Sequence, residues 1–173
     1  VSFGCRFKKC SAAIMITASH NPKEYNGYKV YWNDGAQVLP PHDVGIIDEV
    51  NKITNFNQIH KVPSLNDSHI EYVDSDVDLS YLKAIQTLLI YQEQNKKHGS
   101  SLHAIYTSLH GTGITLIPDA LKNAGFSNVS YVEKQCIPDG DFPTVKSPNP
   151  EEKEALKLGI DLMESQNGDL LIA

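Results

Sequence analysis

A loop near the N-terminus holds the residues whose types and spacing best suit chemistry. Ser19 follows residues 12–17, a short apolar run of strand length, so the serine is presented by a loop instead of being packed in a core. His20 is adjacent to it, and Lys23 and Lys29 follow within ten residues. Cationic surroundings suit a hydroxyl that accepts and returns a phosphoryl group, because this transfer depends mainly on positioning and charge stabilisation.

The residues of this loop also have two other interpretations. A serine and an asparagine before a proline are typical of a side-chain-capped turn, and Ser19, Asn21 and Pro22 stand in that order. Alternatively, Ser19 is the nucleophile of a serine hydrolase. The G-x-S-x-G elbow is missing, however, and His20 would have to bend back onto its neighbour. From the residues alone, all three interpretations stay open.

Composition limits the classes of protein that fit. The 173 residues include 15 Lys and Arg against 21 Asp and Glu, a net charge of −6, and show no basic stripe, which argues against nucleic-acid binding. No apolar run approaches the ~18–20 residues of a membrane helix, and no signal peptide opens the chain. Cys5, Cys10 and Cys136 are an odd number without metal-ligand spacing, so we expect free thiols in a reducing cytoplasm.

The elements that would position the serine loop alternate between strands and helices. Residues 54–76 are polar and without sustained periodicity, which favours a linker. Short connections between helices and strands predict an α/β fold with mainly parallel or mixed sheets covered by helices. The expected strands are 12–17, 28–32, 102–107, 129–133 and 169–173, and the expected helices begin near residues 40, 78, 114 and 149.

Three weaker candidates have structural interpretations. The backbone of residues 110–113, before a helix, offers N–H groups that suit a phosphate, but it is neither a Walker A nor a G-x-G-x-x-G motif, and a tight strand-to-helix turn explains it better. Residues 139–141 (Asp-Gly-Asp) are typical of a turn. The remaining histidines show no ligand spacing and are expected to be surface or structural residues: His42, His60, His69, His98 and His103.

Longer strings of the sequence carry a resemblance. Residues 17–22 read T-A-S-H-N-P and residues 26–29 read N-G-Y-K, a specific combination at this offset. It resembles the active-site serine loop of the α-D-phosphohexomutase superfamily, the phosphoglucomutases and phosphomannomutases. The similarity continues through residues 35–37, 41–43, 109–113 and 144–152. The strings look most like the bacterial phosphoglucomutase branch that includes phosphopentomutase-like members.

The resemblance implies an activity and the residues that carry it. Ser19 would hold a phosphoryl group and exchange it with a sugar phosphate, interconverting the 1-phosphate and the 6-phosphate through a bisphosphorylated sugar. His20 and Lys29 would assist catalysis, and His20, Asn21 and Lys29 would contact the substrate. The implied partner is a small sugar phosphate, and the implied location is the cytoplasm. A catalytically inactive sugar-phosphate-binding module is the main alternative.

The same resemblance implies a magnesium ion, a sugar bisphosphate activator and a division into domains. Ser19 would be a metal ligand through its phosphate, and the aspartate ligands would lie beyond Ala173. Residues 1–53 would be the later part of the first domain, 54–76 a linker, and 77–173 the second domain without its metal loop. We therefore expect a fragment of a longer enzyme, itself inactive.

Overall fold

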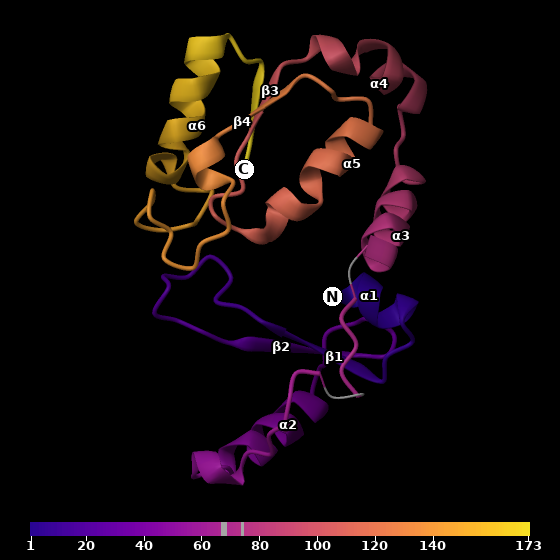
Figure 1. The fold of residues 1–173 in the computed structure, drawn as a ribbon, viewed down its shortest axis with the longest axis vertical. Coiled ribbons are helices and arrows are strands. Elements are labelled where there is room, and N and C mark those ends of the chain that lie inside the picture. The colour runs from indigo at the N-terminus through magenta and orange to yellow at the C-terminus, as the bar shows by residue number, and fades with distance from the viewer. Residues whose placement is uncertain (67–68, 74) are drawn as a thin grey trace. The chain divides into compact units, whose positions relative to one another are not determined.

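The computed structural model describes two compact units, which are taken one at a time (Figure 1). The described residues are 1–66, 69–73 and 75–173. The expected linker, residues 54–76, includes the other three residues, Asp67, Ser68 and Asp74. These three lie outside the described residues, so the linker prediction is not compared with the structure there. The first unit comprises Val1–Thr17 and Gly27–Val77, and the second comprises Ala18–Asn26 and Asp78–Ala173.

The first unit is built around a β-hairpin. The two expected strands form and pair antiparallel, from Ala12 opposite Trp32 to Ile16 opposite Tyr28. A short N-terminal helix precedes them, which the sequence did not predict. The helix expected near residue 40 begins at His42 and ends at Asn51. The elements are α1 (Ser2–Phe7), β1 (Ala12–Ile16), β2 (Tyr28–Trp32), α2 (His42–Asn51) and the 3₁₀ turn η1 (Phe56–Gln58).

Few side chains of the first unit are buried. Cys5 and Val38 are buried, whereas Ile14 and Ile16 on β1 are 65% and 74% exposed. The apolar face of α2 is also largely open, with Val50 44% exposed. Helical spacing of apolar residues predicted the element correctly, but within the described residues that face has little to pack against.

The second unit contains a parallel sheet in the order β4-β3-β5. Helix α6 packs on β3 and β5, and Figure 1 shows α5 on the other side of these strands. The elements are α3 (Ser75–Gln86, which spans the boundary between the units), α4 (Gln92–His98), η2 (Gly99–Ser101), β3 (Ala104–Tyr106), η3 (Thr112–Thr115), α5 (Ile117–Asn123), β4 (Val129–Tyr131), η4 (Glu133–Gln135), α6 (Lys153–Gln166) and β5 (Leu170–Ile172).

Strand β3 is the centre of this sheet. Its three residues, Ala104 to Tyr106, are buried, as expected of a strand covered on both faces. Just after it, the Thr107 N–H donates to the Ile172 carbonyl at 2.9 Å, which continues the parallel pairing with β5. Because the strands are parallel, the segments that follow β3, β4 and β5 leave the sheet at the same edge. Functional residues of α/β sheets gather at this carboxyl edge.

The start of α6 differs from the prediction. Asn149 was expected to cap the helix, but the helix begins at Lys153. The Asn149 Oδ1 instead accepts from the Glu151 N–H at 3.1 Å, and its carbonyl accepts from the Glu152 N–H at 3.1 Å. The asparagine and proline therefore build a separate turn ahead of the helix.

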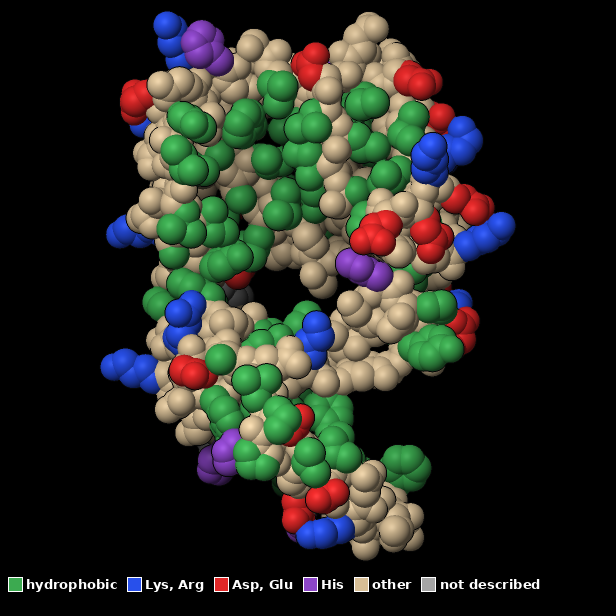
Figure 2. Space-filling model, turned by 180° about the vertical axis from the view of Figure 1, so that it is seen from behind, with side chains coloured by type: hydrophobic (Ala, Val, Ile, Leu, Met, Phe, Trp, Pro, Cys, Tyr) green, Lys and Arg blue, Asp and Glu red, His purple; other side chains and the backbone are tan. Residues whose placement is uncertain are grey.

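Among the helices of the described residues, none is both long and apolar enough to cross a bilayer. Figure 2 shows one face only, on which hydrophobic side chains spread over much of the second unit and charged side chains lie towards its margins.

Candidate functional site

The loop that carries Ser19 joins the two strands of the hairpin. Its base is closed by the Thr17 N–H, which donates to the Gly27 carbonyl at 2.9 Å and extends the ladder beyond β1 and β2. The next bond is from the Asn21 N–H to the Ala18 carbonyl at 3.1 Å, which makes a four-residue turn with Ser19 in its second position.

Ser19 has a backbone conformation that serine seldom adopts. Its φ is +56°, in the left-handed region, and its side chain is exposed. A positive φ at the second turn position is typical of a type II′ turn, where glycine is usual. For a residue with a Cβ this conformation costs about 1–2 kcal/mol. Backbone strain of this kind concentrates at functional sites, so the turn is consistent with a hydroxyl held out for reaction.

The turn brings three of the predicted site residues together. Ser19, His20 and Asn21 are consecutive and exposed within it. In the same unit, Lys23 Nζ lies 2.8 Å from Asp141 Oδ1. The hydrogen bond raises the pKa of Lys23 and lowers the pKa of Asp141. Both side chains are exposed, so the pair contributes little to stability.

Lys29 belongs to the first unit and is described there. It lies on β2 opposite Met15. With Val38, Asp43 and Ile46 it lines a cavity of about 360 Å³ between β2 and α2. An exposed ammonium beside a hollow of this size is accessible to an anionic group.

A second strained turn follows β3, at the carboxyl edge of the parallel sheet. The Gly111 N–H donates to the Ser108 carbonyl at 2.7 Å, and the two residues between them, Leu109 and His110, have φ of +46° and +63°. Two positive φ values define a type I′ turn, which usually takes glycine or asparagine. The leucine and histidine are both buried.

The backbone N–H groups of this turn donate to a buried side chain and to a backbone carbonyl distant in sequence. The Leu109 N–H donates to Thr107 Oγ1 at 3.0 Å, and the His110 N–H donates to the Gln135 carbonyl at 2.7 Å. The backbone N–H groups of Leu109, His110 and Gly111 thus all have acceptors inside the protein. They are not available to a phosphate, which favours the interpretation of this segment as a strand-to-helix turn.

The same side chains form a directed chain of hydrogen bonds. Thr107 Oγ1 donates to Gln135 Oε1 at 2.8 Å, and Gln135 Nε2 donates to Thr144 Oγ1 at 3.2 Å. His110 Nδ1 lies 2.9 Å from the Ile137 carbonyl, which only accepts, so Nδ1 carries a proton. Its Nε2 lies 2.8 Å from Thr144 Oγ1 and hydrogen-bonds with the threonine hydroxyl. Thr144 Oγ1 is thus shared by Gln135 and His110.

Sequence reasoning missed this network. Thr107 and Gln135 are fully buried, yet no local pattern links residues 28 positions apart. One signal in the sequence pointed to such a network. Residues 107–110 were expected where a buried strand passes into a loop, and buried polar side chains at that position need hydrogen-bond partners.

The described residues do not assemble a metal centre by themselves. Among them, no group of three or more His, Cys, Asp or Glu side chains is placed to hold an ion. Mg²⁺ requires about six oxygen ligands in near-octahedral geometry. A phosphorylated Ser19 would supply oxygens but not a complete set, so the residues present do not fit this ion, and no chemical step is assigned to it.

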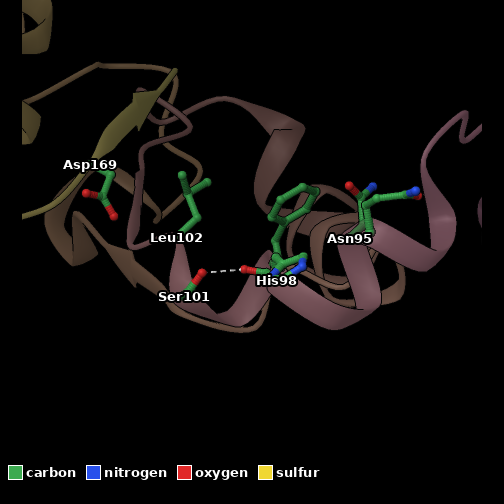
Figure 3. A pocket seen from close by; sticks show the side chains of 8 residues that line it. Asn95, His98, Ser101, Leu102 and Asp169 are labelled. Atoms are coloured by element: carbon green, nitrogen blue, oxygen red, sulfur yellow. Dashed lines mark hydrogen bonds between the residues drawn. The ribbon is translucent and has the colours of Figure 1, made fainter.

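A cavity of about 520 Å³ lies at the opposite edge of the sheet (Figure 3). His98, Ser101 and Asp169 line it, and the Ser101 hydroxyl donates to the His98 carbonyl at 2.6 Å. Asp169 Oδ2 accepts from the His103 N–H at 2.8 Å, which joins the segments that enter β3 and β5. This edge is the amino edge of the sheet, and the cavity took no part in the sequence predictions.

Comparison with known families decides the assignment. The family model described as "Phosphoglucomutase/phosphomannomutase, alpha/beta/alpha domain II" matches residues 79–173, more than half of the chain, and the model for domain I of the same family matches residues 1–57. The chain belongs to the phosphoglucomutase/phosphomannomutase family. The resemblance and the α/β fold class predicted from the sequence are thereby confirmed.

Curated members of the phosphoglucomutase/phosphomannomutase family show the same relation. A phosphoglucomutase of Staphylococcus haemolyticus (strain JCSC1435) is 43% identical over 177 residues, and one of Staphylococcus aureus (strain MRSA252) is 37% identical over 174 residues. Each match covers the whole of this chain but only 31% of the relative. The chain therefore spans about a third of the length of these phosphoglucomutases.

A solved structure extends the likeness to the fold. It is described as the "Crystal structure of putative phosphomannomutase" from Thermus thermophilus and has a TM-score of 0.68 at 21% identity. The match covers 94% of this chain and 33% of that one. At this identity the likeness bears on the fold alone.

Proposed function

We propose that this chain carries the phosphoryl-bearing serine of a sugar-phosphate mutase, with Ser19 as the residue that is phosphorylated. The proposal assigns the parent enzyme the interconversion of sugar 1-phosphate and 6-phosphate, with glucose phosphate as the substrate. The observation that carries it is the turn at Ser19, an exposed hydroxyl on a left-handed residue within the T-A-S-H-N-P string. Membership of the phosphoglucomutase/phosphomannomutase family supports it.

The proposed reaction has two balanced halves. In the first, phosphorylated Ser19 gives its phosphoryl group to a free hydroxyl of the sugar monophosphate, the bond from phosphorus to Oγ breaks, and the hydroxyl proton passes to the freed serine oxygen through a base. In the second, Ser19 Oγ attacks the other phosphorus of the bisphosphate, the bond from that phosphorus to the sugar oxygen breaks, and the serine proton passes to the freed sugar oxygen through the base. His20 and Asn21 would donate to phosphate oxygens. Lys29 would stabilise the negative charge that develops during transfer.

Mass mapping of the parent enzyme tests the assignment of Ser19. Phosphate should be found on Ser19 in the purified protein, and Ser19→Ala should reduce the mutase rate by several orders of magnitude because no other group replaces the covalent carrier. Ser127→Ala, at an exposed position of the second unit, is the control and should keep full activity. An alanine variant with the turnover of the wild type would rule the proposal out.

A substitution by glycine separates the chemistry of Ser19 from its conformation. Glycine adopts a positive φ without a steric cost, so Ser19→Gly should be at least as stable as Ser19→Ala while losing the same activity. The same material tests the serine hydrolase interpretation, because a fluorophosphonate probe should label neither the wild type nor the variants. Labelling of Ser19 would favour a hydrolase.

A further inference from the structure

Helix α1 ends in a motif that pairs two cysteines. The Cys10 N–H donates to the Cys5 carbonyl at 2.9 Å, and the Lys9 N–H donates to the Arg6 carbonyl at 3.2 Å. Lys9 has a φ of +54°. These two bonds around a left-handed residue are those of a Schellman motif, which places residues five apart in sequence next to each other. Here those two residues are Cys5 and Cys10.

The motif brings the two cysteines to neighbouring positions. In a Schellman motif the two positions commonly hold a pair of apolar side chains, and here each holds a thiol. Cys5 is 3% exposed, and its Sγ lies 4.0 Å from the Cys10 carbonyl oxygen. A disulfide requires Cα atoms about 4.4–6.8 Å apart, and a backbone hydrogen bond between the same two residues keeps their Cα atoms close.

The pair is asymmetric in a way that suits stepwise reaction. Burial raises the pKa of the Cys5 thiol, and the neighbouring Cys10 adds to the rise, so Cys5 holds its proton. Cys10 is partly exposed, whereas Cys5 is buried. The accessible thiol is therefore the one that meets a reagent, and the buried one lies behind it.

We propose that Cys5 and Cys10 form a reversible disulfide within the chain, with a low-molecular-weight disulfide such as oxidised glutathione as the oxidant. The Cys10 thiolate attacks one sulfur of that disulfide, its S–S bond breaks, and one glutathione leaves. Cys5 then loses its proton and attacks Cys10 Sγ, and the second glutathione leaves. Two protein thiols are oxidised, one disulfide is reduced to two thiols, and both protons end on glutathione.

This bond would alter the contact between α1 and the hairpin. The Cys5 thiol donates to the Trp32 carbonyl at 3.2 Å, and the disulfide removes that donor. The Trp32 carbonyl keeps the Gly35 N–H at 2.9 Å, so the turn after β2 is not left without its bond. The disulfide can therefore form without loss of the turn after β2. Its formation does not depend on the proposed mutase function.

Peptide mapping of the 173-residue chain tests the proposal. The reduced protein is equilibrated with glutathione at a series of oxidised-to-reduced ratios, quenched with acid, alkylated and digested with trypsin. Trypsin cleaves after Arg6, Lys8 and Lys9, between the two cysteines, so their disulfide joins two separate peptides. We expect that joined pair, two hydrogens lighter than its parts, in protein that remains monomeric on a non-reducing gel.

Three variants give the test matched controls. Cys10→Ser should abolish the joined peptide and leave Cys5 alkylated, whereas Cys136→Ser should leave the joined peptide unchanged. In Cys5→Ser the first step occurs without the second, so glutathione on Cys10 should rise at least tenfold over the wild type. A link that includes Cys136, a link between chains, or wild-type protein that accumulates glutathione on Cys10 beside an alkylated Cys5 would overturn the proposal.

Discussion

Lys29 is the predicted site residue whose contribution is easiest to isolate. Replacing it with methionine keeps the length of the side chain and removes the charge. If Lys29 stabilises the transferring phosphoryl group, kcat/KM of the parent enzyme should fall by roughly 10²–10⁴-fold, the usual scale for such groups. Steady-state kinetics with glucose 1-phosphate measures this.

The control for Lys29 is Lys52, an exposed lysine at the end of α2 that pairs with Glu49. Lys52→Met should leave the kinetics unchanged. A fall of less than about threefold for Lys29→Met would show that Lys29 is simply a solvated residue of its strand.

Tyr106 makes stability depend on alkaline pH. Burial raises its pKa to about 12, and Cys136 and Tyr131 add to the rise. In the unfolded chain a tyrosine ionises near pH 10. The folded state thus keeps a proton that the unfolded state releases, so the stabilisation is complete below about pH 10 and is lost as pH rises towards about 12.

Tyr106→Phe should remove this part of the pH dependence. Urea unfolding at several pH values from 9 to about 12 should show a shallower loss of stability than in the wild type. Tyr25→Phe, at a 64% exposed position, should retain the slope of the wild type. Equal slopes in all three proteins would mean that Tyr106 ionises as freely when folded as when unfolded.

The turn after β3 is held by residues distant in sequence, and Thr144 connects two of them. Its hydroxyl oxygen accepts from Gln135 Nε2 and hydrogen-bonds with His110 Nε2. Thr144→Val keeps the shape and leaves those two polar groups short of a partner, which costs about 1–3 kcal/mol for a buried group. We expect the free energy of unfolding of the 173-residue chain to fall by that amount in urea titrations.

Thr115→Val is the comparison for Thr144, since Thr115 is exposed in the same unit. It should change the free energy of unfolding by no more than a few tenths of a kcal/mol. If the two variants are equally stable, the hydrogen-bonded chain does not support the turn.

Strong local patterns made several elements predictable. β1 and β2 were predicted because apolar and β-branched residues fill both runs, and Asn33, Asp34 and Gly35 mark the turn that follows. α1 was missed, because residues 2–7 are too few to show a period. The start of α6 was misplaced because Asn149 and Pro150 satisfy the chemistry of a cap while forming a turn of their own.

The candidate site was predictable to the extent that it is local. The residues of the serine loop are consecutive in sequence, so their types alone indicated a candidate site. The left-handed φ of Ser19 was not predictable, because serine does not require that conformation. The network of Thr107, His110, Gln135 and Thr144 was missed for a different reason, since it depends on pairings that only the folded sheet creates.

We predict that the 173-residue chain by itself has no measurable mutase activity. It spans 31% of the phosphoglucomutases that it matches, and its described residues contain no cluster of acidic side chains for a metal. Positioning of a bound substrate is worth about 7–11 kcal/mol of the barrier, and a partial site forfeits much of that. We expect no turnover in a coupled glucose 6-phosphate assay supplied with Mg²⁺ and a sugar bisphosphate.

Calorimetry with Mg²⁺ accompanies that assay. Binding should be weaker than millimolar, because an unphosphorylated Ser19 offers one neutral oxygen to an ion that requires about six. A full-length relative serves as the positive control. Micromolar affinity, or turnover within a hundredfold of that relative, would show that the chain holds a complete site.

The position of the single tryptophan has a consequence for how folding can be observed. Trp32 ends β2 in the first unit, whereas the edge-to-face tyrosine pair Tyr106 and Tyr131 lies in the second. The hairpin joins residues near in sequence, while β3 and β5 are brought together by segments 66 residues apart. Short loops close faster than long ones, so indole fluorescence should report an early kinetic phase. Tyrosine signals should report a later one, which lets a single stopped-flow experiment time the two units separately.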